Sequence, residues 1–120
     1  MNSLNDLLRR LKAFTAERDW DQFHTPRNLA TALAVEASEL VELFQWDLIQ
    51  VPPKEISARR ERLEEEIADV LIYALLFADK VGIDVGHAVL KKLDRNAINY
   101  PVHLSKGSAI KYRDRERNDE

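Results

Sequence analysis

The chain has 120 residues, a hydrophobic fraction of 45% and a formal net charge of −3. These values are typical of one globular domain and give no general reason to expect nucleic-acid binding. Because the chain has no cysteine, disulfides, thiolate metal sites and a cysteine nucleophile are excluded. Its first residues lack a secretory signal pattern, and no apolar run approaches the roughly 20 residues that span a bilayer. We therefore expect a cytoplasmic protein that does not enter a membrane.

The first expected helix covers about residues 5–18 and begins after Ser3, a favourable N-cap residue. Its apolar residues have the spacing of a buried stripe; they are Leu4, Leu7, Leu8, Leu11 and Phe14. Residues 17–26 combine polar and aromatic side chains, which indicates a loop folded over something. A second helix is expected over about residues 25–48, opened by Thr25-Pro26 and stopped by Pro52-Pro53.

A third helix is expected over about residues 58–80, with Ser57 as its N-cap and Gly82 as its C-terminal signal. Its second half is apolar almost all round, which indicates burial against another subunit. Asp84 then caps a fourth helix over about residues 85–98.

These elements predict an all-α fold, an antiparallel four-helix bundle completed by oligomerisation. Residues 1–112 are expected to form its single domain. Residues 113–120 are charged and are expected to be a disordered tail.

Two pairs of acids lie one helical turn apart in otherwise apolar stretches: Glu36 with Glu39, and Glu66 with Asp69. Because residues i and i+3 share a helix face, the four carboxylates would meet if the two helices packed together. Such a cluster repels itself without a cation, and oxygen ligands suit Mg²⁺ or Mn²⁺. Mg²⁺ usually completes its shell with phosphates, so the pattern indicates a polyphosphate site. The alternative is a solvated helix face.

Aromatic residues form a second candidate set: Trp20, Phe23, Trp46 and Tyr73. Trp46 is expected two turns beyond Glu39 on the second helix, and Tyr73 one turn beyond Asp69 on the third. Two indoles and a phenol near a metal–phosphate site can hold a base by stacking. The alternative is ordinary core packing. Of the three histidines, His24 is the notable one because it shares the loop of Trp20.

Basic and amide residues near the end of the chain form a third set. Lys92 and Asn96 are one turn apart on the fourth helix and can face a ligand together. Arg95, Lys106 and Lys111 lie nearby in the sequence. The alternative is that these charges only keep the helix soluble.

The acid pairs E-A-S-E at residues 36–39 and E-I-A-D at residues 66–69, on consecutive helices, resemble the MazG-like superfamily of all-α nucleotide pyrophosphohydrolases. Four flanking segments look more specifically like its dCTP pyrophosphatase branch: residues 14–29, 42–46, 69–73 and 100–112. The resemblance covers about residues 11–112, nearly the whole chain.

The resemblance implies Mg²⁺-dependent hydrolysis of a nucleoside triphosphate to the monophosphate and pyrophosphate, with dCTP or a 5-modified dCTP as the expected substrate. This activity is nucleotide-pool house-cleaning, carried out by a homotetramer built from dimers. The implied metal ligands and catalytic residues are Glu36, Glu39, Glu66 and Asp69. The implied nucleotide-binding residues are Trp20, Gln22, Phe23, His24, Trp46, Tyr73, Lys92 and Asn96.

One position departs from the pattern of this branch. Its dCTP-preferring members tend to carry a histidine on the first helix, nine residues before the tryptophan, where this chain has Leu11. The missing imidazole bears on base preference more than on catalysis. Two other functions stay open on the sequence: a non-catalytic helical interaction module, and a pyrophosphohydrolase for other non-standard nucleotides.

Overall fold

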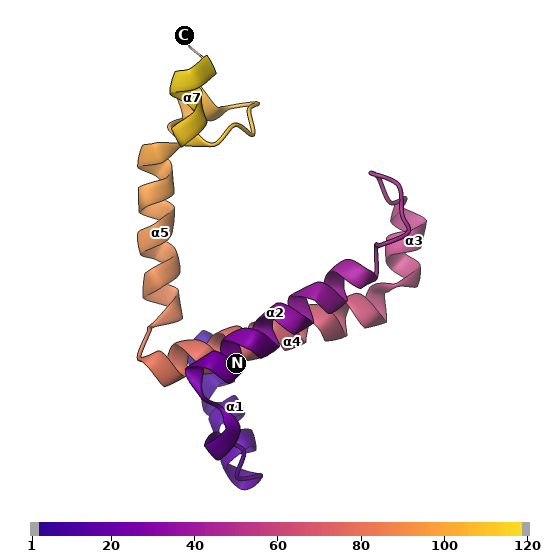
Figure 1. Ribbon diagram of the computed structural model, residues 1–120, viewed down its shortest axis with the longest axis vertical. Coiled ribbons are helices and arrows are strands. Elements are labelled where there is room, and N and C mark those ends of the chain that lie inside the picture. Colours follow the sequence, from indigo (N-terminus) through magenta and orange to yellow (C-terminus); the bar gives the residue numbers. More distant parts are fainter. Residues whose placement is uncertain (1–2, 119–120) are drawn as a thin grey trace. The chain divides into compact units, whose positions relative to one another are not determined.

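Helices make up all of the regular structure in the part of the chain that the computed structural model describes, residues 3–118. The expected all-α class is therefore confirmed. The elements in chain order are α1 (Leu4–Glu17), the 3₁₀ turn η1 (Asp21–Phe23), α2 (Pro26–Glu42), α3 (Pro53–Ala58), α4 (Arg60–Val81), α5 (Val85–Asn99), α6 (Val102–Ser105) and α7 (Tyr112–Asn118) (Figure 1). The chain divides into two compact units, residues 1–83 and 84–120.

Side-chain caps fix the starts of three helices, as the sequence predicts. The hydroxyl of Ser3 accepts from the backbone N–H of Asp6 at 3.2 Å, and that of Thr25 accepts from Asn28 at 3.1 Å. The Asp84 carboxylate accepts from the N–H of His87 at 3.0 Å. Each cap satisfies a donor that the first helical turn leaves unpaired.

Two helices of the first unit end in the same way, with a residue in the left-handed region. At the end of α4 this residue is Gly82, at φ 75°, as expected. At the end of α1 it is Asp19, at φ 54°. The backbone N–H of Trp20 donates to the Thr15 carbonyl at 3.0 Å, and the N–H of Asp19 donates to the Ala16 carbonyl at 3.1 Å. This pair of bonds is the Schellman motif, which turns the chain sharply out of the helix.

The boundaries between the second and third expected helices were wrong. The second helix ends at Glu42 instead of about residue 48, and residues 43–46 form turns with i to i−3 backbone bonds. Ser57 is not an N-cap. It lies inside the separate short helix α3, which Pro53 opens as its first residue. The chain then turns at Arg59, at φ −99° and ψ 1°, before α4 begins.

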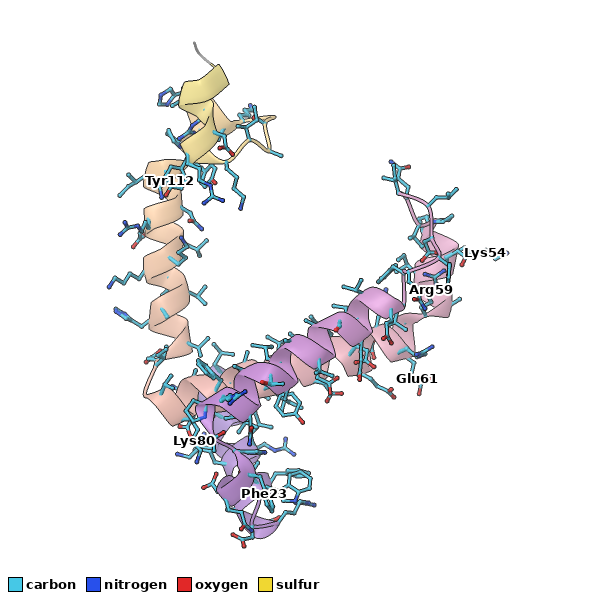
Figure 2. The ribbon with its side chains drawn as sticks, in the orientation of Figure 1. Phe23, Lys54, Arg59, Glu61, Lys80 and Tyr112 are labelled. Atoms are coloured by element: carbon cyan, nitrogen blue, oxygen red, sulfur yellow. The ribbon has the colours of Figure 1, made fainter. Side chains whose placement is uncertain are left out.

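In the first unit, α2 and α4 run antiparallel side by side, and α1 packs across α4 (Figure 1). The buried apolar residues of the described chain are few: Leu29 on α2 and Leu75, Leu76 and Ala78 on α4. Ion pairs tie the N-terminal segment to the end of α4, between Lys12 and Asp79 at 3.6 Å and between Lys80 and Asp21 at 3.5 Å. Lys80 is labelled in Figure 2.

Much of the expected apolar stripe of α1 stays accessible to solvent. Leu4, Leu7 and Phe14 are classed as exposed, whereas Leu8 and Leu11 are half-buried. The core of the single chain therefore covers only part of the apolar surface that the sequence provides.

The second unit consists of α5, α6 and α7. Its C-terminal segment folds back through Arg115, whose guanidinium donates to the Ser105 hydroxyl at 3.2 Å and to the Asn99 carbonyl. The rings of Tyr100 and Tyr112 meet edge to face with centroids 5.7 Å apart. Residues 113–118, which the sequence analysis expects to be disordered, are helical here, and residues 119–120 lie outside the described part.

No helix in the described part is long and apolar enough to cross a bilayer.

Candidate metal centre and pocket

Three of the four predicted carboxylates converge between α2 and α4. Glu36 and Glu39 from α2 and Glu66 from α4 place one carboxylate oxygen each within 4.8 Å of the others. All three side chains are half-buried. One oxygen each of Glu36 and Glu66 is buried without a hydrogen-bond partner. The helix packing that the sequence analysis requires for this meeting is therefore present.

The charge of this cluster is reflected in the protonation of its members. Burial raises the pKa of Glu36 to about 7, with further contributions from the neighbouring carboxylates of Glu39, Asp69 and Glu66. Burial, followed by the charge of Glu39, also raises the pKa of Glu66. The cluster thus favours bound positive charge, either a proton or a cation. Buried, unpartnered carboxylate oxygens fit a hard divalent cation such as Mg²⁺.

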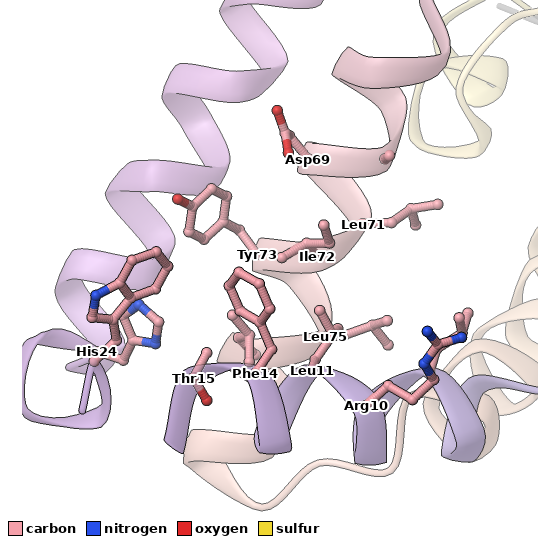
Figure 3. A pocket seen from close by; sticks show the side chains of 14 residues that line it. Arg10, Leu11, Phe14, Thr15, His24, Asp69, Leu71, Ile72, Tyr73 and Leu75 are labelled. Atoms are coloured by element: carbon pink, nitrogen blue, oxygen red, sulfur yellow. The ribbon is translucent and has the colours of Figure 1, made fainter. Parts of the chain in front are cut away.

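Asp69 lies one turn beyond Glu66 on α4. It is close enough for its charge to contribute to the raised pKa of Glu36. Its half-buried carboxylate also lines the pocket described next (Figure 3).

The pocket has a volume of about 660 Å³ and lies between α1, the loop of residues 18–25 that carries Trp20 and His24, and α4. That volume is in the range of small-molecule sites. Three predicted nucleotide-binding residues contribute to its wall: Trp20, His24 and Tyr73. Figure 3 shows Tyr73 and Phe14 reaching into it from facing elements. The remaining wall is mostly apolar, and the residues that contribute to it are Leu7, Leu11, Phe14, Ala68, Leu71, Ile72, Leu75 and Leu76, with Arg10 and Thr15.

The Schellman turn at Asp19 sets the position of the Trp20 ring. The indole packs edge to face on Phe14, with centroids 5.6 Å apart and planes at 73°. The Arg18 guanidinium covers the Phe14 ring at 3.6 Å. An unpartnered buried nitrogen, Nδ1 of His24, lies close by in the same loop. The sequence analysis missed the strained residue of this turn because an aspartate is not the usual residue at such a position.

Gln22 and Phe23 follow Trp20 but do not line the pocket. The Gln22 amide donates to the backbone carbonyl and the carboxylate of Asp19, each at 3.0 Å. Phe23 is 61% exposed. Their predicted contact with a nucleotide stays a prediction.

Trp46 is not where helical spacing placed it. Because α2 ends at Glu42, Trp46 lies on the following turn and is 90% exposed. The carbonyl of Leu43 in that turn accepts from Arg59 just before α4, whereas the pocket lies along Ala68 to Leu76 of α4. Trp46 and the pocket of the same chain therefore lie toward opposite ends of α4.

Lys92 and Asn96 lie one turn apart on α5 in the second unit. Lys92 is exposed, and Asn96 is half-buried. Their predicted role in nucleotide binding stays a prediction.

Two hydrogen-bonded polar side chains, Thr15 and Arg59, had no signal in the sequence analysis. Thr15 is buried in α1, where its hydroxyl donates to the Lys12 carbonyl at 3.1 Å. Arg59 bonds to three residues of the α2–α4 connection, as described below. Arg59 stands in a run of charges, so only its partners, up to 16 residues away, distinguish it from its neighbours.

Comparison with known proteins defines the class of the chain. Residues 31–114 match the model of the MazG-like family, and the chain belongs to this family. It is 50% identical to dCTP pyrophosphatase 1 of Bos taurus over 114 residues, or 93% of this chain and 68% of that protein. Identity to dCTP pyrophosphatase 1 of Homo sapiens is 47% over 112 residues, or 92% of this chain and 66% of that protein. The match thus spans about two thirds of the mammalian proteins.

A solved structure supports the same assignment. A pyrophosphatase from Archaeoglobus fulgidus superposes with a TM-score of 0.74 at 39% sequence identity. The superposition covers 81% of this chain and 91% of that one. The expected MazG-like fold type is thereby confirmed.

Proposed function

We propose that the chain is a nucleotide pyrophosphatase that hydrolyses dCTP, or a 5-modified dCTP, to the monophosphate and pyrophosphate. The observation that carries this proposal is the cluster of Glu36, Glu39 and Glu66 beside an aromatic-lined pocket. The names of the mammalian relatives, about half identical over most of this chain, support the substrate.

The cluster supplies the ligands for the metal. Glu36, Glu39, Glu66 and Asp69 would hold Mg²⁺, which when bound neutralises the triphosphate and makes its phosphorus easier to attack. We assign Glu39 the role of orienting the attacking water; one of its carboxylate oxygens lies within 4.8 Å of oxygens of Glu36 and Glu66. Asp69 faces the pocket and so joins the metal site to the nucleoside site.

The pocket provides a site for the base and sugar. Trp20 and Tyr73 offer aromatic faces to a planar base. His24 adds a buried ring nitrogen without an internal partner, which suits a hydrogen bond to a ligand. Leu11 is an apolar part of the wall at the position where dCTP-preferring relatives tend to have a histidine, so we expect it to influence base preference.

We further propose that the chain works as a homotetramer built from dimers. The exposed apolar residues of α1 and α5 support association. Trp46 lies toward the other end of α4 from its own pocket, so its predicted contact with a base would be to the nucleotide of another copy. Lys92 and Asn96 complete the predicted set from α5.

The decisive experiment measures pyrophosphate release with Mg²⁺ from canonical and 5-modified deoxy- and ribonucleoside triphosphates. We expect the highest kcat/KM for dCTP or its 5-substituted forms and none in the presence of a chelator. A preference for another base would leave the proposed reaction standing but change the assigned substrate. Leu11 would then be the first residue to replace with histidine. The absence of release from every nucleotide by folded, metal-loaded protein would overturn the proposal.

A further inference from the structure

One side chain, that of Arg59, makes the side-chain hydrogen bonds that join residues 43–51, between α2 and α3, to another element of the first unit. The Arg59 guanidinium donates to the Leu43 carbonyl at 2.9 Å and to both carboxylate oxygens of Asp47, one of them at 2.9 Å. It also donates to Glu55 at 2.9 Å. Among the side chains of residues 3–115, the bonds from Arg59 to Leu43 and Asp47 are the only side-chain hydrogen bonds that join residues 43–51 to another element. Arg59 is labelled in Figure 2.

This contact is sheltered and has the geometry of a strong ion pair. The side chains of Arg59 and Asp47 are only 23% and 22% exposed. The hydrogen bonds from Arg59 hold the pKa of Asp47 below its ordinary value. The guanidinium also lies 5.6 Å from the centre of the Phe44 ring. A two-pronged arginine–carboxylate contact fixes orientation as well as distance.

Trp46 lies between the residues that this contact holds. Leu43 and Asp47 are hydrogen-bonded to Arg59, and the Phe44 ring centre lies 5.6 Å from its guanidinium. The Trp46 side chain, by contrast, is 90% exposed and makes no aromatic contact in the described part. The indole is thus not held by packing of its own, and its position follows from the backbone on either side.

We propose that Arg59 is a positioning residue for the reaction. Through Leu43 and Asp47 it orders the turn that presents Trp46, so that nucleotide binding does not have to order this loop. The inference rests on the proposed function, in which Trp46 contacts the base of a bound nucleotide. Ordering a contact in advance increases affinity because less conformational entropy is lost on binding.

The test compares Arg59→Ala and Asp47→Asn with the matched control Arg60→Ala, whose arginine is adjacent and exposed. Two quantities are measured in each protein. The first is kcat and KM for the best nucleotide, and the second is the ¹⁵N heteronuclear NOE of the Trp46 indole, identified with Trp20→Phe. Loss of an ordered stacking contact predicts a KM about tenfold higher in Arg59→Ala, with kcat changed less.

We expect the indole NOE to fall in Arg59→Ala and Asp47→Asn and to stay unchanged in Arg60→Ala. If Arg59→Ala does not fold, the KM and the indole NOE of Asp47→Asn, which keeps the Arg59–Leu43 bond, decide the test. An unchanged KM or an unchanged NOE in the folded variants would overturn the inference. If the wild-type protein hydrolyses no nucleotide, the proposed function and the link to catalysis fail together. The NOE then still decides whether Arg59 orders Trp46.

Discussion

A proton and a metal ion would compete for the Glu36 carboxylate, and this competition can be measured. Its carboxylate titrates near 4.5 when unperturbed, but at about 7 in the fold because it is buried among other acids. Between these values the folded protein binds more protons than the unfolded chain. The contribution of Glu36 to stability is therefore present at low pH and lost as pH rises toward 7.

We predict that metal-free protein loses thermal stability through this group as pH rises from about 4.5 to about 7. Because a bound cation takes the place of the proton, Mg²⁺ should raise the melting temperature more at pH 7.5 than at pH 5. Melting curves with chelator and with Mg²⁺ at both values measure this. The pH-dependent difference in melting temperature between wild type and Glu36→Gln isolates the residue, and no difference would contradict the assignment.

Replacing Glu66 by glutamine should lower kcat/KM by about 100-fold or more, because a metal-binding site loses one charged ligand. The metal-free fold should be at least as stable as wild type, since the substitution removes one of the mutually repelling charges. Steady-state kinetics and chemical unfolding of the same preparation measure both. Glu65→Gln, on the exposed side of α4, is the matched control. Wild-type kcat in Glu66→Gln would show that Glu66 is not a ligand of the catalytic metal.

At the scale of the element, the end of α1 has a strained backbone conformation at Asp19 that the sequence did not predict. Asp19 adopts φ 54°, a conformation that costs a residue with a Cβ atom about 1 kcal/mol or more. Asparagine and aspartate tolerate it better than other such residues. The amide of Gln22 bonds to the Asp19 carboxylate and secures the turn.

We expect Asp19→Ala to lower the free energy of unfolding by about 1 kcal/mol, because alanine tolerates φ 54° less well than aspartate and the bond from Gln22 to the Asp19 carboxylate is lost. Asp19→Asn keeps a side-chain acceptor and should stay close to wild type. Urea unfolding of the two variants measures the difference. An alanine variant as stable as the asparagine variant would show that the carboxylate does not support the turn that places Trp20.

The helices also show which structural features could be predicted from the sequence. Helix starts followed from Ser3, Thr25 and Asp84, because a cap is a local interaction between residues three apart. The acid cluster followed because i, i+3 spacing forces paired residues onto one face. The end of α2 did not follow: the Leu43 carbonyl just beyond it accepts from Arg59, 16 residues away, and such a partner is not visible in the local sequence. Because α2 ends at Glu42, Trp46 lies beyond the helix on which the i, i+7 spacing placed it.

At the scale of the whole molecule, the predicted association can be tested on α5. Leu90 and Leu93 are 64% and 56% exposed in the single chain. We expect Leu90→Glu together with Leu93→Glu to reduce the molar mass in solution, because two charges would have to be buried in an apolar contact. Light scattering coupled to size exclusion measures the mass. Lys91→Glu is the control with an unchanged assembly, and a double variant of wild-type mass would place the contact elsewhere.

The small core has a consequence for how activity depends on the amount of protein. The described chain buries few apolar side chains, while apolar residues stay exposed on α1, where the pocket wall begins, and on α5. If partner copies cover these surfaces, mass action links folding to assembly. Specific activity should then fall on dilution and recover on concentration. Cellular abundance would in that case set the fraction of working enzyme, as well as its total amount.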